Sequence, residues 1–269
     1  MFAFAQKETQ EKKSYGHASL EFDNNSVYLG RKDSIVTPYL GPTLGYYHKS
    51  GFFIEGTLYY LMRKGSNRID EASLRGGYDF SFGNFSGEIA AEKLFYNSGS
   101  TNVKSEVQGD ISASLSYDFG FIETSFWPSV NLGTKSDYLM SWGVDHNFSV
   151  AGEKLDITPT FWLNGSTRNF YGSYYGNRRF KKKNGAGTTV TASVMDASKF
   201  KLMNYELSLP FSYKVKNFIF GFTPTFSVPA NPAVVTIVVK PPIGPSTTRV
   251  VTEKTENTLY FSLSAEIKF

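Results

Sequence analysis

Carboxylates at alternate positions are the sequence's main candidates for chemistry. Acids recur on one side of an alternating pattern, as Asp79 does within 71–82 and Asp110 within 107–119, and alternate residues of a β-strand share one face. A ring of acids lining a pore favours cations, whereas pairing with bases or plain solvation gives it a structural role. The residues predicted to line such a pore are Glu55, Arg75, Asp79, Glu88, Glu106, Asp110, Glu123, Trp127, Asp156, Trp162 and Glu206.

Catalytic chemistry finds little support in the residue types. The chain has no Cys, which excludes disulfides, thiolate zinc sites and Cys nucleophiles. Its three histidines belong to no HExxH motif, and no GxSxG or Gly-rich phosphate loop is present. His146 and Ser149 fall on opposite faces of their segment, so they are not expected to meet. We therefore expect no catalytic, cofactor-binding or metal site and no enzyme activity.

Period-two alternation must position these residues. In 107–119, Val107, Ile111 and Leu115 share a face that is opposite Asp110 and Ser114. The segment is longer than the ~5–6 residues of an ordinary strand and suits a membrane-spanning strand, which needs ~9–11. Twelve such segments are predicted, at 16–31, 35–48, 51–64, 70–82, 84–96, 103–119, 121–133, 137–148, 154–167, 200–215, 217–229 and 254–269.

The connections between these segments alternate in length. Tight turns follow the even-numbered strands, and looser links follow the odd-numbered ones, with two long links at 168–199 and 230–253. Short turns on one side and long loops on the other are typical of outer-membrane barrels. Residues 234–240 and 247–252 are predicted to form a hairpin beyond the membrane, and residues 188–195 an extension above the tenth strand.

The apolar faces carry large side chains in every segment, more than the interior of one barrel would hold. If these faces point to lipid and the polar faces to a lumen, the pattern is explained. A large β-sandwich with one wet face per sheet is the alternative. No apolar run is long enough for a membrane-spanning helix. Twelve strands predict a pore that is narrow or partly blocked.

A basic group stands in the longest loop, interleaved with aromatic residues. Such interleaving can mark nucleic-acid binding, but the net charge of +4 does not suggest it, and no nucleic-acid partner is expected. The group could pair with lipopolysaccharide phosphates, be solvated, fold into the acidic lumen as a plug, or bind a specific ligand. Its members are Arg168, Arg178, Arg179, Lys181, Lys182 and Lys183.

The ends and the prolines complete the expected organisation. Residues 1–14 are predicted to be a mobile remnant of a signal or leader, because Ala3-Phe4-Ala5 fits a small-x-small cleavage pattern; a chance cluster is the alternative. Residues 15–269 are predicted to form a single barrel domain.

Six prolines inside the predicted strands conflict with this fold, since proline lacks a ladder donor. They are Pro38, Pro42, Pro128, Pro159, Pro210 and Pro224.

The segments 19–22 (SLEF), 51–56 (GFFIEG) and 117–120 (YDFG), with the terminal Phe269, carry a resemblance. In them the chain resembles bacterial outer-membrane β-barrel proteins, in particular small porins of Gram-negative bacteria. The resemblance implies an all-β, transmembrane antiparallel up-and-down barrel of about 12 strands in the outer membrane. It also implies insertion by the barrel-assembly machinery and passive exchange of small solutes. It assigns no functional residue.

Three functions are compatible with this sequence. The first is a channel for small hydrophilic solutes, including cations, through an acidic lumen. The second is a non-conducting structural or interaction barrel whose extracellular loops bind a protein partner or lipopolysaccharide. The third, a membrane enzyme, has least support. Bilayer conductance separates the first two, and a lipase or protease assay decides the third.

Overall fold

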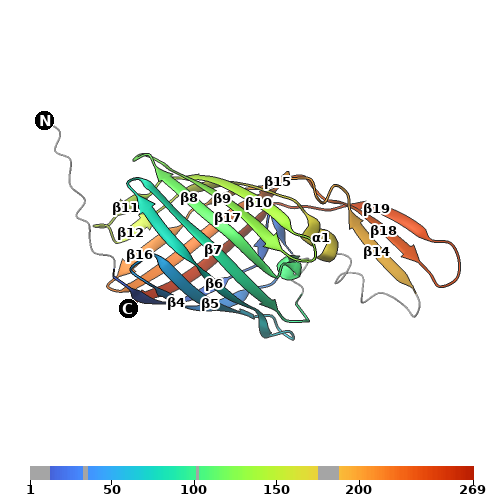
Figure 1. The fold of residues 1–269 in the computed structure, drawn as a ribbon, viewed down its shortest axis with the longest axis horizontal. Coiled ribbons are helices and arrows are strands. Elements are labelled where there is room, and N and C mark those ends of the chain that lie inside the picture. The colour runs from blue at the N-terminus through green and yellow to red at the C-terminus, as the bar shows by residue number, and fades with distance from the viewer. Residues whose placement is uncertain (1–12, 33–35, 101–102, 175–187) are drawn as a thin grey trace.

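The structure, a computed structural model, describes residues 13–32, 36–100, 103–174 and 188–269. Its main body is a closed antiparallel barrel of twelve strands, seen from the side in Figure 1, and the predicted fold class is confirmed. Three of the strands are interrupted and carry two labels each. In ring order the twelve strands are β1 (Tyr15–Asp23), β4 (Tyr39–Tyr47), β5 (Phe52–Leu61), β6 (Arg68–Phe82), β7 (Phe85–Tyr96), β8 (Gly109–Asp118), β9 (Glu123–Leu132), β10 (Asp137–Asp145) with β11 (Phe148–Val150), β13 (Thr160–Ser166) with β12 (Leu155–Ile157), β15 (Lys201–Ser208) with β16 (Phe211–Val215), β17 (Phe218–Pro229) and β20 (Thr258–Lys268).

The last strand closes the ring. β20 pairs with β17 over ten residues and with β1 over seven. Phe269 and Gly16 also exchange two backbone hydrogen bonds, of 2.7 and 3.0 Å. The start of β1 and the end of β20 lie at the end of the barrel that carries the short turns (Figure 1). One such turn places Gly51 at a φ of 105°, where a Cβ would come within 2.3 Å of the Asp79 carbonyl oxygen, so only glycine suits it.

Two predicted strands are shorter than expected. The first, predicted over 16–31, ends at Asp23, because Asn24 and Asn25 turn the chain: the Asn25 side chain accepts from the Thr37 backbone N–H at 3.1 Å. The short strands β2 (Val27–Tyr28) and β3 (Arg31–Lys32) follow it outside the wall. The sixth, predicted over 103–119, begins at Gly109, and Val103–Glu106 form the 3₁₀-helix η1.

The six prolines sit where the ladder is already broken. Pro38 precedes β4, while Pro159 and Pro210 occupy the breaks between β12 and β13 and between β15 and β16. Pro42 and Pro128 remain in strands, opposite gaps in the β4–β5 and β8–β9 registers. Pro224 faces the β15–β16 break, and its carbonyl accepts from Leu209 N–H at 3.1 Å. The conflict is thus resolved by local interruptions rather than by free edges.

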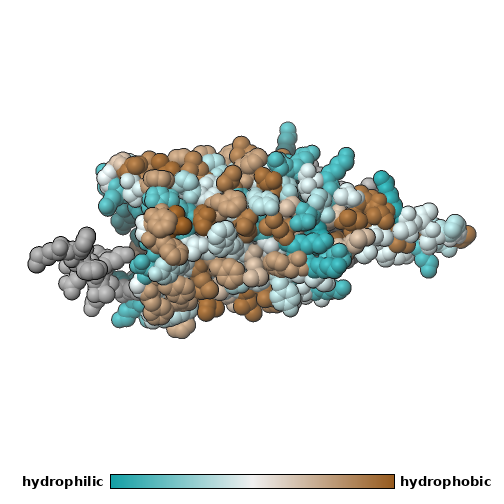
Figure 2. Space-filling model, turned by 90° about the horizontal axis from the view of Figure 1, so that it is seen from above, coloured by the Kyte–Doolittle hydropathy of each residue, from teal (hydrophilic) through white to brown (hydrophobic). Residues whose placement is uncertain are grey.

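The outer wall of the barrel is apolar. Large hydrophobic side chains that alternate with the lumenal ones are exposed on it, among them Leu44, Ile54, Leu74, Ile89 and Ile111. Figure 2 shows hydrophobic residues along the wall and hydrophilic ones gathered toward the end with the projecting sheet. Such a surface is suited to hydrocarbon. Among the described residues, no helix has the length and apolarity needed to cross a bilayer.

A second, three-stranded sheet projects from the loop end of the barrel (Figure 1). Its strands are β14 (Thr189–Val194), β18 (Val234–Lys240) and β19 (Thr247–Thr252), in that order. The hairpin predicted at 234–240 and 247–252 is confirmed. The extension expected at 188–195 pairs with β18 of this sheet.

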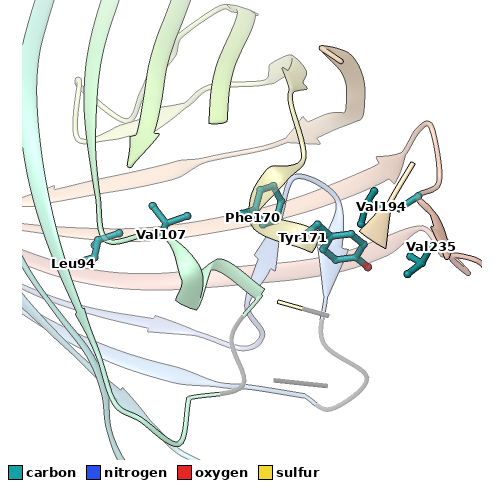
Figure 3. Packing of buried hydrophobic residues seen from close by; sticks show 7 residues of the cluster. Leu94, Val107, Phe170, Tyr171, Val194 and Val235 are labelled. Atoms are coloured by element: carbon teal, nitrogen blue, oxygen red, sulfur yellow. The ribbon is translucent and has the colours of Figure 1, made fainter. Parts of the chain in front are cut away.

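The buried apolar cluster lies at the mouth of the barrel, not in its bore (Figure 3). We call the segments 24–32, 103–107 and 168–174 the lid. The cluster forms where the lid meets Leu94 of β7 and Val194 and Val235 of the projecting sheet. The lid includes the helix α1 (Asn169–Tyr174) as well as η1. Phe170 and Tyr171 of α1 and Val107 are nearly fully buried there.

Candidate functional site in the barrel lumen

A cavity of about 560 Å³ lies inside the barrel, along β6 to β10 and β13. Its wall is built largely from small side chains on alternate positions of adjacent strands: Ser112 and Ser114 of β8, Ser129 of β9 and Ser141 of β10. Because period-two geometry directs these serines inward, their short side chains leave the bore open at this level. The cavity is within the ~300–1,000 Å³ range of small-molecule sites.

The cavity is more negative than positive. Three carboxylates, those of Glu88, Glu92 and Asp110, face it together with one guanidinium, that of Arg75. Glu92 and Asp110 are register partners on β7 and β8, so they lie side by side on the wall. The charged side chains that line this cavity therefore sum to a formal charge of −2.

An ion network extends from the cavity toward the turn end of the barrel. Arg75 pairs with Glu88, lies 3.8 Å from Glu55 and stacks over the Phe53 ring at 5.0 Å. Glu55 also accepts a hydrogen bond from the Tyr47 hydroxyl at 2.7 Å.

Beyond Glu55, the same network continues across the first and last strands. Glu55 lies 3.4 Å from His17, whose other ring nitrogen is 3.6 Å from Glu266. The network therefore links β7, β6, β5, β1 and β20 around the lumenal wall.

The two lumenal tryptophans are adjacent. The ring centroids of Trp127 and Trp162 are 5.3 Å apart with an interplanar angle of 56°. Trp162 covers Gly143, where an added Cβ would meet the indole at 2.7 Å. Trp127 lines the cavity and remains 50% exposed to it. The third tryptophan, Trp142, faces outward, since it alternates with the lumenal Ser141 on β10.

The remaining residues predicted to line the pore are spread along the bore. Asp79 is the register partner of Glu88, and Glu206 accepts from Asn204 at 2.8 Å and from Tyr260 at 3.2 Å. Near the turn end, Glu123 lies between Asp118 and Asp145 on adjacent strands, and Asp156 pairs with Lys214 at 2.9 Å. Glu106 is misplaced by the prediction, because it belongs to η1 at the mouth and not to a strand of the wall.

The lid spans the mouth of the barrel. Tyr28 follows β1, yet its hydroxyl accepts a hydrogen bond of 2.5 Å from Asn131 of β9. β9 lies six strands from β1 in either direction around the ring, directly across the bore. The Tyr28 ring also packs against Phe170 of α1, with centroids 5.2 Å apart. Residues from both sides of the bore therefore meet over the cavity.

A buried arginine fastens this first segment of the lid. Arg31, 4% exposed, donates to the carbonyls of Leu29, Met203 and Ala230 at 2.7 to 3.1 Å. It also forms a 3.4 Å ion pair with Glu253. These contacts tie the segment to β15 and to the chain leaving β17.

A second buried arginine lies beside α1. Arg168, 2% exposed, donates to the Asn231 carbonyl at 2.8 Å. Burial and the neighbouring positive charge of Arg31 lower the pKa of Arg168. Sequence reasoning missed Arg31, although the turn-forming residues Asn24, Asn25 and Gly30 were a signal that the first strand ends early. It placed Arg168 with the basic residues of the longest loop, whereas the structure buries this side chain against the Asn231 carbonyl.

The basic residues Arg178, Arg179, Lys181, Lys182 and Lys183 lie outside the described residues. The lid consists of described parts of the loops, including the segment between β1 and β4.

The residues weighed for catalysis do not come together. The His146 ring bonds the Phe121 carbonyl, while Ser149 donates to Asp156. His48 and Ser50 are 2.7 Å apart, but they belong to one exposed turn in which the ring nitrogen also accepts from the Ser50 N–H. Within the described ranges, no three His, Asp or Glu side chains are grouped to hold a metal ion.

A closed antiparallel barrel with a lipid-compatible wall, a polar bore, short turns at one end and long loops at the other defines a bacterial outer-membrane β-barrel of porin-like architecture. No protein-family model and no curated sequence relative matches the chain.

Solved structures of similar fold include the NanC porin, with a TM-score of 0.50 at 8% identity over 94% of this chain and 98% of that one. They also include the KdgM porin, with a TM-score of 0.48 at 10% identity over 95% and 99% of the two chains. LpxR from Salmonella typhimurium has a TM-score of 0.47 at 10% identity over 94% and 100%. At 8% identity the likeness to NanC shows a common fold and nothing further.

Proposed function

We propose that this protein is an outer-membrane channel for small hydrophilic solutes and that its lumen favours cations. The observation that supports this most is the 560 Å³ cavity, which three carboxylates and one guanidinium face. A solute of either charge must pass these groups, and in a narrow bore their field is weakly screened. Cations are therefore favoured over anions of equal size.

Whether this path is open depends on the position of the lid. The lid packs over the cavity through Tyr28 and Phe170, and in the described part of the chain its contacts with the wall are those of loops and side chains, whereas the barrel is held by backbone ladders between neighbouring strands. Opening the lid therefore costs less than disturbing the barrel. We propose a channel that alternates between a covered and an open mouth.

Planar-bilayer recording of the purified full chain tests this function. Under a KCl gradient, we expect discrete conductance steps and a zero-current potential of the sign that K⁺ permeation produces. A zero-current potential of the opposite sign refutes the cation preference. Absence of steps, also when residues 168–174 are replaced by a short Gly/Ser linker, refutes the channel.

A non-conducting barrel that binds a partner at its loops is the second candidate. The apolar packing of the lid favours it, because Val107, Phe170 and Tyr171 bury themselves over the mouth as a folded core would. In this reading the projecting sheet or the basic residues 178–183 bind a protein or lipopolysaccharide. Either function requires insertion by the barrel-assembly machinery. Binding to lipopolysaccharide vesicles without conductance would favour this second candidate.

A further inference from the structure

Trp127 is unusual for its place in the lumen. The wall around it is made of serines, and its indole is nevertheless 50% exposed within the cavity rather than packed away. Trp162 backs it at 5.3 Å and is itself accommodated by the absence of a side chain at Gly143. The two rings, inclined at 56°, form an aromatic corner that opens onto the cavity.

Carboxylates complete the surroundings of this corner. Glu88 is the register partner of Ser114 on β8, the strand beside Trp127 on β9, so Glu88 and Trp127 flank the same serine from opposite sides. Neighbouring strands are ~4.8 Å apart, which places their backbones ~10 Å from each other. Glu92 and Asp110 face the same cavity about 13 Å further along the wall, since they lie four residues from Glu88 and Ser114 at ~3.3 Å per residue.

An aromatic face and surplus negative charge select for one class of ligand. The π-face of Trp attracts a cation within ~6 Å of the ring centroid, and weakly hydrated ammonium groups lose little on leaving water. A small inorganic cation would keep its water and gain little from the ring. A neutral solute of the same shape would gain nothing from the carboxylates.

We infer that Trp127, backed by Trp162 in a cavity to which Glu88, Glu92, Asp110 and Arg75 give a formal charge of −2, forms a binding site for a small organic ammonium ion. The inference deepens the proposed cation-favouring channel, since it names the class of cation that the lumen would hold. In a conducting barrel such a site binds its solute weakly, because a permeant ion must also leave.

Calorimetric titration of the full chain in detergent tests the site with choline and with 3,3-dimethyl-1-butanol, which replaces the ammonium nitrogen by carbon. We expect choline to bind in the millimolar range and its uncharged isostere at least about tenfold more weakly. Equal heats for both probes, or no binding of choline, would overturn the site.

Two matched variants locate the binding. Trp127→Leu should weaken choline binding by about tenfold, as expected for the loss of a desolvated cation–π contact. Trp142→Leu, which removes an outward-facing tryptophan on the neighbouring strand, should leave binding unchanged. If both variants weaken binding equally, the site is not at Trp127. Trp127→Phe, which keeps a weaker ring, should give an intermediate affinity if Trp127→Leu does not fold.

The outcomes separate this site from the channel itself. Conductance with no discrimination between the two probes refutes the site and leaves the channel. Choline binding that depends on Trp127, in a barrel without conductance, supports the site and refutes the channel.

Discussion

Replacement of Arg31 by Ala should release the lid while leaving the barrel folded. The side chain is 4% exposed and bonded to carbonyls of Leu29, Met203 and Ala230, with an ion pair to Glu253. Removing one partner of a buried pair costs about 3–5 kcal/mol, because the other charge stays buried without compensation.

That cost should fall mainly on the covered state of the mouth. At 1.4 kcal/mol per factor of ten, the equilibrium between covered and open states shifts by roughly 10²- to 4 × 10³-fold. The strand ladders do not involve the Arg31 side chain, so unfolding of the barrel should be little affected. Replacing both Arg31 and Glu253 by Met should restore part of the covered state, since neither member of this pair is then left without its partner.

Single-channel recording measures the fraction of time spent open, and limited chymotrypsin digestion, which cleaves after aromatic residues such as Tyr28 and Phe170, reports exposure of the lid. Arg31→Ala should increase both. Arg249→Ala, which removes an exposed arginine of β19, is the control and should change neither. If Arg31→Ala leaves the open fraction and the digestion pattern unchanged, the buried arginine does not hold the lid and the reasoning fails.

Three further variants test the wall and the bore. Leu44→Arg, on the outer face, should destabilise the barrel by about 2–4 kcal/mol if it lies near the bilayer midplane, measured by urea titration in lipid vesicles; no destabilisation would contradict an outward Leu44. Glu92→Gln with Asp110→Asn removes two of the three cavity carboxylates and should shift the zero-current potential toward zero or the anion side, so an unchanged potential would place selectivity elsewhere. Gly143→Val should push Trp162 from its place, because even a Cβ meets that ring at 2.7 Å; unaltered near-UV circular dichroism would argue against this packing.

The barrel could be predicted from sequence because its rule is local. Alternation as in 107–119 specifies which side chains share a face, and the hairpin at 234–240 and 247–252 is bounded by clear turn residues. The prolines were recognised as a conflict, but their resolution depends on partner strands. Only the three-dimensional register shows that Pro224 stands opposite the break at Pro210.

The lid could not be predicted because its contacts join segments far apart in the chain. Alternation continues through Val27 and Arg31. The strand predicted over 16–31 therefore includes residues that, in the structure, leave the barrel wall. The contact of Tyr28 with Asn131 spans 103 residues, and no local pattern identifies it. The pairing of Arg75 with Glu88 and Glu55 could not be predicted either. The sequence does not distinguish a lumenal acid that selects ions from one that forms an ion pair with a base.

Thiol accessibility tests the central claim most directly, because the chain has no cysteine of its own. Ser112→Cys introduces a thiol that faces the cavity, and Ile111→Cys introduces one on the neighbouring, outward position. In lipid vesicles, we predict that the cysteine at 112 reacts faster with a cationic methanethiosulfonate than with an anionic one, after normalising to a free thiol, and that the cysteine at 111 reacts with neither. Faster reaction at 111, or preference of the cysteine at 112 for the anionic reagent, would contradict a wet, cation-favouring bore inside an apolar wall.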